Sequence, residues 1–458
     1  MKLQISKIRI ALIFYVILLP YLLNPAEDIC SALAGIWSGS VEFPGFKYRI
    51  VIIINKIEDF SADIIFPDQS ETTYPVDIEV NFPEITIASE KMQLNFAGVY
   101  KNDQISGNWN QMKRQMLLVL QKVDKVILPE RPQTPQPPFP YQVKEISFGH
   151  DRANLSGTLT IPDFIDSYLA VILIPGVGTH DRDNTIFGHK PFWVIADFLT
   201  RRGFAVLRYD ERGGGKSSGD RSKATSADFA EDVKAGVTFL HSQKYIKKVG
   251  LLGHSEGGTI ASLVAADDHS IAFIILLGSP GLKGDEYNYQ FEESMSRAMG
   301  ASEAAIERKL ELQKEIINLL LKNTDEEKIE NEIKKLYMKY DPSLTQEQVQ
   351  AAINRFLSPW FQYNIRYDPI EVLQHLQCPV LAIFGEKDLQ VPPEGNLDAV
   401  RSALSLAGNN DCEVIELPGL NHYMQSALTG KPDEYGKIEE TISLDLLDKI
   451  SSWIQKRN

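Results

Sequence analysis

Residues 249–258 read VGLLGHSEGG, and this segment decides the fold of the 458-residue chain. An apolar run typical of a buried strand leads into Gly-x-Ser-x-Gly, and a helix-forming segment follows it. A serine at such a strand-to-helix turn adopts a strained backbone, which the flanking glycines permit because they carry no Cβ. The turn would lift the hydroxyl of Ser255 above the edge of a sheet, so Ser255 is the candidate nucleophile. An ordinary glycine-rich turn is the alternative interpretation.

The alternation of strand-like and helical segments extends outward from this turn in both directions. Continuous apolar runs occur as LAVILIP, FAVLRYD, IAFIILLG, PVLAIFGEKD and CEVIEL, with amphipathic helical segments between most of them. Such runs are typical of parallel strands that are buried on both faces of a sheet. We therefore predict an α/β fold for residues 141–458.

A serine nucleophile needs a base, and the base needs a carboxylate that holds its tautomer. In hydrolases built on this turn, the acid and then the histidine follow the serine along the chain. Asp388 ends the run PVLAIFGEKD and is the predicted acid, with Glu386 as its nearest competitor. His422 follows the next strand, in LPGLNH, and is the predicted base. His254 adjoins Ser255 and is predicted to be structural, with its side chain pointing away from the serine.

Two backbone N–H groups are expected to stabilise the oxyanion. One belongs to Glu256, at the start of the helix after the nucleophile, where negative charge is favoured. The second should come from the loop after an early strand, and IPGVG at residues 174–178 fits because its glycines allow a close approach of the backbone. Val177 is the predicted second donor, and Gly178 is placed in the substrate pocket.

Residues 285–367 interrupt the strand–helix alternation. They are rich in Glu, Lys, Leu, Ala and Gln, with opposite charges at helical spacing, as in AIERKLELQKEIINLLLKN. Each helix is too short for a sustained coiled coil. We predict a helical cap that roofs the pocket, with Trp360 and Phe361 as candidate apolar contacts; a plain core role for both aromatics is the alternative.

The segment before the α/β domain has a different character. Residues 35–128 contain short β-rich runs separated by turn residues, which predicts a small all-β domain, either a barrel or a sandwich. Trp37 and Trp109 are expected to pack in its core. Residues 129–140 contain RPQTPQPPFP, which predicts a semi-rigid, extended linker.

The first residues have the pattern of an export signal. Lys2, Lys7 and Arg9 precede a short apolar stretch, and Ala32-Leu33-Ala34 fits a small-residue cleavage site. We predict a signal peptide over residues 1–34 and export to the periplasm or the extracellular space. The alternative is an uncleaved membrane anchor, although the apolar run is short for a bilayer span.

Composition excludes several classes of protein. Sixty-one acidic against 47 basic side chains give a net charge of -14, which disfavours nucleic-acid binding. Three cysteines and no Cys/His cluster predict neither a disulfide framework nor a metal site, and no cofactor is expected. Cys378 and Cys412 are expected to be free thiols, with a disulfide as the alternative. The segment RGGGKS at residues 212–217 ends like a phosphate-binding loop but has Asp210 where the first glycine would stand.

The chain resembles the α/β-hydrolase superfamily at these residues. More narrowly, it is similar to bacterial carboxylesterases of the EstD type, which lie near the serine aminopeptidase-like hydrolases. The matching segments are PGVGTHDRDN, GHKPF, ADFLTRRGFAVLRYDERGGGKS, GHSEGG, SPWFQYNIRYDP, FGEKDLQVPPEGN and LPGLNH. The resemblance implies hydrolysis of small carboxylic esters, with Ser255, Asp388 and His422 as the triad. One departure is Val177, where relatives often carry a smaller residue.

We therefore predict a serine hydrolase that cleaves small esters through an acyl-enzyme intermediate, without metal or cofactor. An exported peptidase or thioesterase on the same triad is one alternative, because only the pocket would differ. An aminopeptidase would need carboxylates in the cap to hold the amine of its substrate. A non-catalytic exported binding protein is the second alternative. The oligomeric state is left open.

Overall fold

The computed structural model describes residues 32–43, 46–56, 59–70, 72–111, 114–163 and 167–457. The basic and apolar parts of the predicted signal peptide lie outside these residues. Within the described chain, a β-barrel precedes a larger α/β unit in the sequence. None of the described helices combines the length and the hydropathy needed to cross a bilayer.

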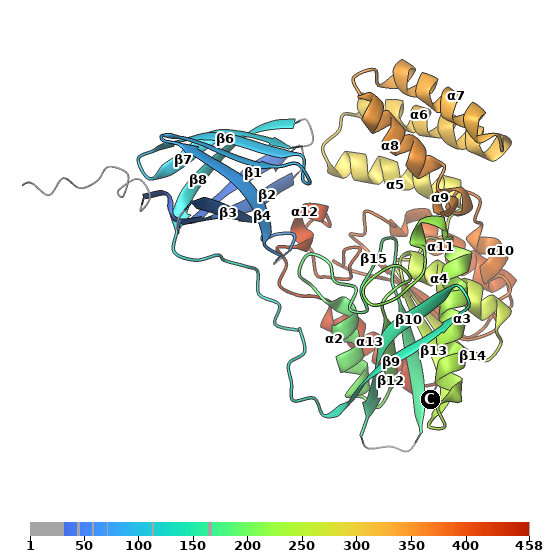
Figure 1. The fold of residues 1–458 in the computed structure, drawn as a ribbon. Helices are drawn as coiled ribbons and strands as arrows, with labels where there is room; N and C mark the ends of the chain where they lie inside the picture. Colours follow the sequence, from blue (N-terminus) through green and yellow to red (C-terminus); the bar gives the residue numbers. More distant parts are fainter. Residues whose placement is uncertain are drawn as a thin grey trace, which may run out of the picture. The chain divides into compact units, whose positions relative to one another are not determined.

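The N-terminal unit is a closed eight-stranded antiparallel barrel (Figure 1). Its strands are β1 (Gly35–Phe43), β2 (Phe46–Lys56), β3 (Phe60–Ile65), β4 (Tyr74–Asn81), β5 (Glu84–Ser89), β6 (Leu94–Lys101), β7 (Gln104–Gln111) and β8 (Arg114–Val123). Pairing of β1 with β8 closes the barrel. Trp37, Phe96 and Trp109 are fully buried within this unit, which fits the expected core role of the two tryptophans.

The larger unit is built on an eight-stranded sheet in the order β16-β15-β14-β13-β11-β12-β10-β9. The strands are β9 (Tyr141–His150), β10 (Ala153–Pro162), β11 (Tyr168–Ile174), β12 (Ala205–Tyr209), β13 (Ile246–His254), β14 (Ile271–Leu277), β15 (Val380–Gly385) and β16 (Cys412–Leu417). β11 to β16 are parallel, and the antiparallel pair β9–β10 extends the sheet beside β12. The predicted α/β-hydrolase fold is therefore confirmed, and the predicted all-β domain precedes it in the sequence.

Helices cover both faces of this sheet. Side chains alternate along β11, so that Val171 and Leu173 face one apolar core while Ala170 and Ile172 face the other. The first face is covered by α2 (Pro191–Thr200) and α13 (Leu444–Gln455). The second is covered by α3 (Ser226–Ser242), α4 (Glu256–Asp267), α10 (Pro369–Leu373) and α11 (Pro393–Leu406).

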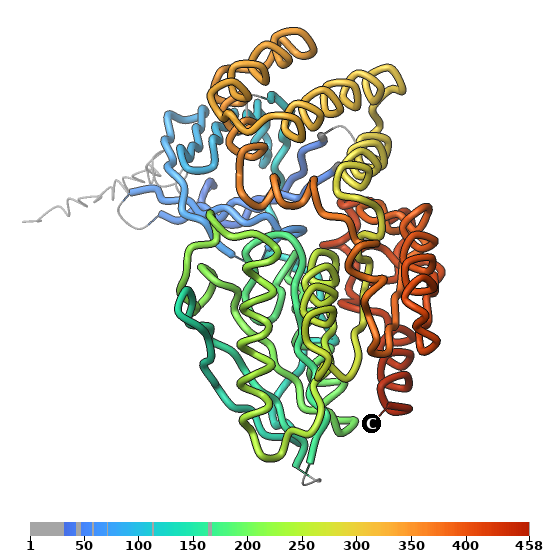
Figure 2. Tube along the Cα trace, turned by 90° about the vertical axis from the view of Figure 1, so that its right-hand side faces the viewer, coloured from blue at the N-terminus to red at the C-terminus, as the bar shows by residue number. Residues whose placement is uncertain are grey.

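The predicted helical insertion lies between β14 and β15. It comprises α5 (Gly284–Ala298), α6 (Glu303–Lys322), α7 (Glu326–Tyr340), α8 (Gln346–Phe356) and α9 (Pro359–Asn364). Figure 2 shows these helices, coloured yellow to orange, gathered at one end of the α/β unit. They have a core of their own, in which Ile316, Ile333, Ile353 and Phe361 are buried.

The proline-rich segment before β9 is attached to the α/β unit and does not run free as a spacer. The Arg131 guanidinium donates to the carbonyls of Phe187, Gly436 and Ile438 at 2.7–3.0 Å. Gln133 exchanges hydrogen bonds with the backbone of Ile442. The segment also contains a turn, in which the N–H of Thr134 donates to the carbonyl of Arg131. The predicted linker is therefore anchored by side chains whose partners depend on tertiary structure. Both described cysteines, Cys378 and Cys412, are free thiols.

Candidate active site

Ser255 lies in the turn between β13 and α4, with φ 56° and ψ -123°. A positive φ is unfavourable for a residue with a Cβ, and here the surrounding backbone holds it. The Ser255 N–H donates to the carbonyl of Leu277 on the neighbouring strand at 2.8 Å, and the N–H of Gly258 closes the first helical turn onto the Ser255 carbonyl. The sharp turn expected from the sequence is therefore present in the backbone.

The glycines around this turn are required by close backbone approach. A Cβ on Gly253 would lie 2.1 Å from the carbonyl oxygen of Gly257, and a Cβ on Gly257 would lie 2.1 Å from that of Ile174. Gly176, in the loop after β11, passes so near the serine that its Cβ would lie 2.9 Å from the Cβ of Ser255. The loop that carries the predicted second oxyanion donor is thus in contact with the nucleophile.

Asp388 and His422 form a buried, oriented pair. The Nδ1 of His422 lies 2.8 Å from Oδ2 of Asp388, and both residues are at most 3% exposed. The other carboxylate oxygen accepts the N–H groups of Gln390 and Val391, each at 2.8 Å. Since a carboxylate only accepts, Nδ1 of His422 carries the hydrogen and Nε2 is left unprotonated in the neutral ring.

Ser255 and His422 line the same cavity, of about 260 Å³. Gly176, Val177 and Glu256 also line it, whereas Asp388 is linked to it through its contact with His422. The predicted triad and both predicted oxyanion residues therefore lie together at the carboxyl ends of the parallel strands. Among the described hydrogen bonds, neither the Val177 N–H nor the Glu256 N–H has a protein acceptor. Val177 is 53% exposed although it lines the cavity.

The predicted pocket residues divide into two groups. Trp360 lines the cavity. Phe361, by contrast, is 1% exposed and packs in the cap core against Phe356, because adjacent helical residues point in different directions. Gly178 is not among the lining residues, and a Cβ there would meet the ring of His180, 2.8 Å from its Nε2. His180 itself lines the cavity.

Most of the cavity roof was missed by sequence reasoning. The cap contributes Tyr287, Asn288, Phe291, Arg355, Trp360, Asn364 and Tyr367. They lie on α5, α8 and α9 or, for Tyr367, just after α9. Apart from Trp360, which was a candidate, nothing in the sequence distinguishes them from cap core residues. Gln390 and Tyr423 also line the cavity, and the sequence could have indicated them because they lie in the same loops as Asp388 and His422.

His254 differs in part from its predicted placement. Its Nε2 lies 2.7 Å from the carbonyl oxygen of His422, and the two rings are 4.8 Å apart. Burial lowers the pKa of His254 to about 3, so the ring is neutral. The side chain is structural, as expected, but it faces the loop of the predicted base and lines the cavity. His189 is buried against Thr441 and Tyr435 and does not reach the cavity lining.

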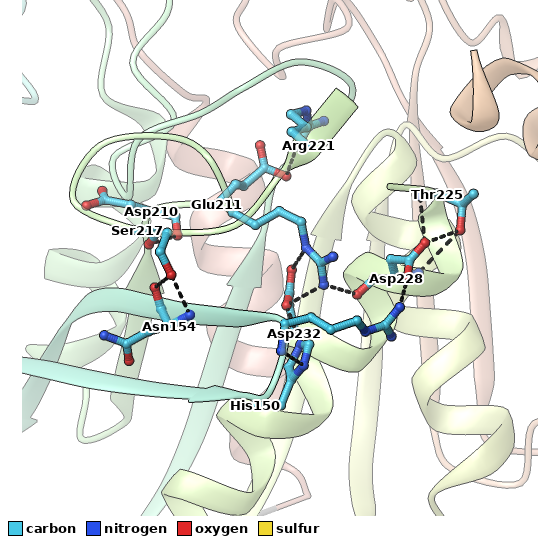
Figure 3. A network of polar contacts seen from close by, with 12 residues as sticks. His150, Asn154, Asp210, Glu211, Ser217, Arg221, Thr225, Asp228 and Asp232 are labelled. Carbon is cyan, nitrogen blue, oxygen red and sulfur yellow. Dashed lines mark hydrogen bonds and ion pairs between the residues drawn. The ribbon is translucent and has the colours of Figure 1, made fainter. Parts of the chain in front are cut away.

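The segment that ends like a phosphate-binding loop is a structural network (Figure 3). Arg212 pairs with Asp232 on α3, and Ser217 donates to the carbonyl of Asp210. Glu211 accepts from the N–H of His180 and lies 3.0 Å from Arg221, while burial raises the pKa of Glu211 to about 8. Together with the hydrogen bonds that Ser217 and Ser218 accept from the backbone of β10, these contacts hold the loop to β10 and α3.

The carboxylates on either side of Arg182 are likewise occupied by protein partners: Asp181 accepts hydrogen bonds from the backbone of Asp183 and from the hydroxyl of Thr185. Arg182 pairs with Asp210 at 2.9 Å and with Glu145 at 2.6 Å, and Asp183 pairs with Arg208. Within the described ranges, no group of three or more His, Cys, Asp or Glu side chains is arranged to hold a metal ion.

Comparison with known proteins assigns the chain to a family and finds similar proteins. The family model described as serine aminopeptidase, S33, matches residues 190–426, just over half of the chain. Esterase EstD of Thermotoga maritima is 28% identical over 322 residues, which cover 70% of this chain and 69% of its own length. The matched family segment contains Ser255, Asp388, His422 and the whole cap.

Solved structures are similar at lower identity. A Pyrococcus furiosus esterase aligns with 69% of this chain and 90% of its own, at 16% identity and a TM-score of 0.42. A proline iminopeptidase of Mycobacterium smegmatis aligns with 69% of this chain and 98% of its own, at 15% identity and a TM-score of 0.44.

Proposed function

We propose that this chain, which belongs to the serine aminopeptidase (S33) family of α/β hydrolases, is a serine esterase that cleaves small carboxylic esters through an acyl-enzyme intermediate. The observation that carries the proposal is the convergence of Ser255 and the His422–Asp388 pair on one cavity. The similarity to esterase EstD supports an ester as the substrate.

In the proposed mechanism, Ser255 Oγ attacks the ester carbonyl while the unprotonated Nε2 of His422 takes its proton. Asp388 holds His422 in the required tautomer and stabilises the imidazolium that forms. His422 then passes the proton to the departing alcohol. A water molecule, activated by the same imidazole, attacks the acyl-enzyme and releases the carboxylic acid and the free serine.

The N–H groups of Val177 and Glu256 are proposed to stabilise the negative charge on the carbonyl oxygen. Both residues line the cavity, and the loop of Val177 approaches the Cβ of Ser255 closely through Gly176. Removal of one oxyanion donor in comparable enzymes costs about 3–4 kcal/mol of transition-state stabilisation, so each amide would contribute substantially to the rate.

The charge of the cavity favours an ester over an aminoacyl substrate. A free substrate amine needs an accessible carboxylate. Among the described residues that line this cavity, the only acidic one is Glu256, whose carboxyl is buried and already accepts two hydrogen bonds. The acidic cap places no carboxylate there and instead contributes a cation, Arg355. An ester therefore fits this cavity better than an aminoacyl substrate with a free amine.

The proposal is tested with purified protein and p-nitrophenyl acetate and butyrate. Ser255→Ala should abolish turnover, and a fluorophosphonate probe should label wild-type protein at Ser255 but not the variant. Aminoacyl arylamides, assayed alongside, should be poor substrates. Unchanged ester turnover in the Ser255→Ala variant would refute the mechanism, and turnover of arylamides alone would favour the peptidase. We further propose export, to be tested by fractionation and by N-terminal sequencing of the isolated protein.

A further inference from the structure

Three elements of the α/β unit meet at one carboxyl oxygen beside the nucleophile. Glu256, the first residue of α4, is 5% exposed. Its Oε1 accepts a hydrogen bond from Ser226 Oγ at 2.6 Å and another from Trp360 Nε1 at 2.6 Å. Ser226 begins α3, and Trp360 lies in α9 of the cap. The side chain next to Ser255 therefore joins the base of the site to its roof.

The α3 end of this junction is rigidly held. Thr225 and Asp228 form a capping box at the start of α3, and the Arg212 guanidinium bonds both the Asp228 carbonyl and the Asp232 carboxylate (Figure 3). α4 is fixed in turn by the tight glycine contacts at the nucleophile turn. Ser226 and Glu256 therefore form a fixed base, against which the cap partner is positioned.

Trp360 is the cap partner, and it belongs to two cores at once. Its half-buried ring packs against the apolar core under α3 and α4 and also against the core of the cap. The same ring lines the catalytic cavity. A hydrogen bond that fixes the direction of this indole therefore also fixes how low the roof lies over the cavity.

Loss of the hydrogen bond from Trp360 to Glu256 should be costly, because both polar groups are poorly supplied with other partners. Oε2 of Glu256 is buried without a hydrogen-bond partner among the described residues, so the carboxyl gains its stabilisation through Oε1 alone. The charges of Arg221 and Glu211 also act on this carboxyl. Without an acceptor at Oε1, the indole N–H would be left unpaired at the rim of the cavity, and the ring would reorient toward water.

We propose that Glu256 is a positioning residue whose side chain fastens Trp360 over the catalytic cavity and thereby sets the size of the ester group that the cavity admits. The proposal rests on the esterase function proposed above and deepens it. The backbone N–H of Glu256 acts on the oxyanion, whereas the side chain acts through Trp360 on substrate selection.

The first test compares p-nitrophenyl butyrate with p-nitrophenyl octanoate. Trp360→Phe removes the indole donor, and Glu256→Met removes the acceptor at similar length. Each should reduce the preference for butyrate, as the ratio of kcat/KM values, by about five-fold, the equivalent of one hydrogen bond. The effect should lie mainly in KM. The double variant should change the ratio no further than either single variant, because both remove the same contact.

Two further variants complete this comparison. Glu256→Gln keeps an Oε1 acceptor and should recover at least half of the lost preference. Trp193→Phe is the matched control, because Trp193 is half-buried on α2 and does not line the cavity. Its preference should equal that of the wild type. Additive effects in the double variant, or a Gln variant that behaves like Met, would overturn the proposal.

The second test does not require turnover. Hydrogen–deuterium exchange of the amides in residues 360–365 should be several-fold faster in Glu256→Met than in wild type or Trp193→Phe, with each protein measured equally far below its own melting temperature. Absence of ester hydrolysis in the wild-type protein would refute the proposed function alone. The exchange measurement tests the Glu256–Trp360 contact independently of any activity. Equal exchange in Glu256→Met and wild type would overturn the fastening even in an active esterase.

Discussion

His254 and His422 are joined by a hydrogen bond although they are 168 residues apart: His254 Nε2–H donates to the backbone carbonyl of His422 at 2.7 Å. A carbonyl only accepts, so this contact fixes the Nε2-protonated tautomer of His254. The end of the nucleophile strand β13 thereby holds the loop that carries the proposed base. The spacing between nucleophile and base is set by this backbone contact as well as by Asp388.

Replacement of His254 should therefore impair catalysis more than folding. In His254→Leu the His422 carbonyl loses its donor, and the loop can shift relative to Ser255. We expect a loss of about ten-fold to a hundred-fold in kcat, because sub-ångström misplacement of a base is costly, together with a stability loss of about 1–2 kcal/mol. Steady-state kinetics and urea unfolding measure the two effects. A kcat equal to that of the wild type would show that the loop position does not depend on this bond.

Gly278 leaves room for Asp388, the carboxylate that orients the proposed base His422. Its φ is +53°, and a Cβ there would lie 2.9 Å from Oδ2 of Asp388 and 3.5 Å from Nδ1 of His422. Gly278→Ala should push the carboxylate away from the imidazole, in addition to the backbone strain of a positive φ. We expect kcat/KM to fall by about a hundred-fold in an esterase assay, the scale that follows when the orienting acid is disturbed.

Gly408→Ala is the matched control for this prediction. Its φ is +67°, and a Cβ there would meet nothing within 4 Å. This variant carries the same kind of backbone strain, of about 1 kcal/mol, without a clash at the site. It should lose stability while kcat/KM stays at the wild-type level. Similar activity losses in both variants would mean that strain alone accounts for the effect at Gly278.

The sequence predicted those parts of the site that depend on local chain geometry. Ser255 was identified because a strand, a tight glycine turn and a helix follow one another within ten residues. Asp388 and His422 were identified because each follows the carboxyl end of a late strand, and parallel strands bring such ends to one edge of the sheet. The order of the strands themselves, in contrast, is a tertiary property.

The cap could be predicted as helices but not as a binding surface. Trp360 and Phe361 are neighbours in the sequence and both aromatic, yet one lines the cavity and the other fills the cap core. Their difference depends on how α9 is rotated, which the Trp360–Glu256 hydrogen bond helps to fix. Likewise, the roles of Arg131 and Gln133 in attaching the proline-rich segment come from partners about 300 residues away.

Buried histidines should make the protein sensitive to acid. Burial lowers the pKa of His189 to about 4 and that of His254 to about 3, below the value of about 6.5 in an unfolded chain. The unfolded state therefore binds more protons than the folded state between pH 6.5 and 4, and the free energy of unfolding falls as the pH is lowered. Each ring should cost on the order of 1–2 kcal/mol at pH 5.

Urea unfolding at pH 7 and pH 5 measures this acid sensitivity. His189→Gln removes one titrating group while keeping a polar side chain beside Thr441 and Tyr435. The variant is expected to be less stable than wild type at pH 7 but to lose less stability on going to pH 5. An equal loss in both proteins would assign the acid sensitivity to other groups.

Glu211 should act in the opposite direction at higher pH. Burial raises its pKa to about 8, despite the nearby guanidinium of Arg221, whereas an unfolded glutamate titrates near pH 4.5. Between these values the folded state holds a proton that the unfolded state has lost, so this group lowers the free energy of unfolding as the pH rises toward 8.

Glu211→Gln mimics the protonated side chain, and its stability relative to wild type should therefore improve between pH 5 and pH 8, by on the order of 2–3 kcal/mol. Glu307→Gln, on the exposed face of α6, is the control and should show no such trend. Parallel pH profiles for Glu211→Gln and wild type would show that Glu211 is ionised in the folded protein, with Arg221 compensating its charge.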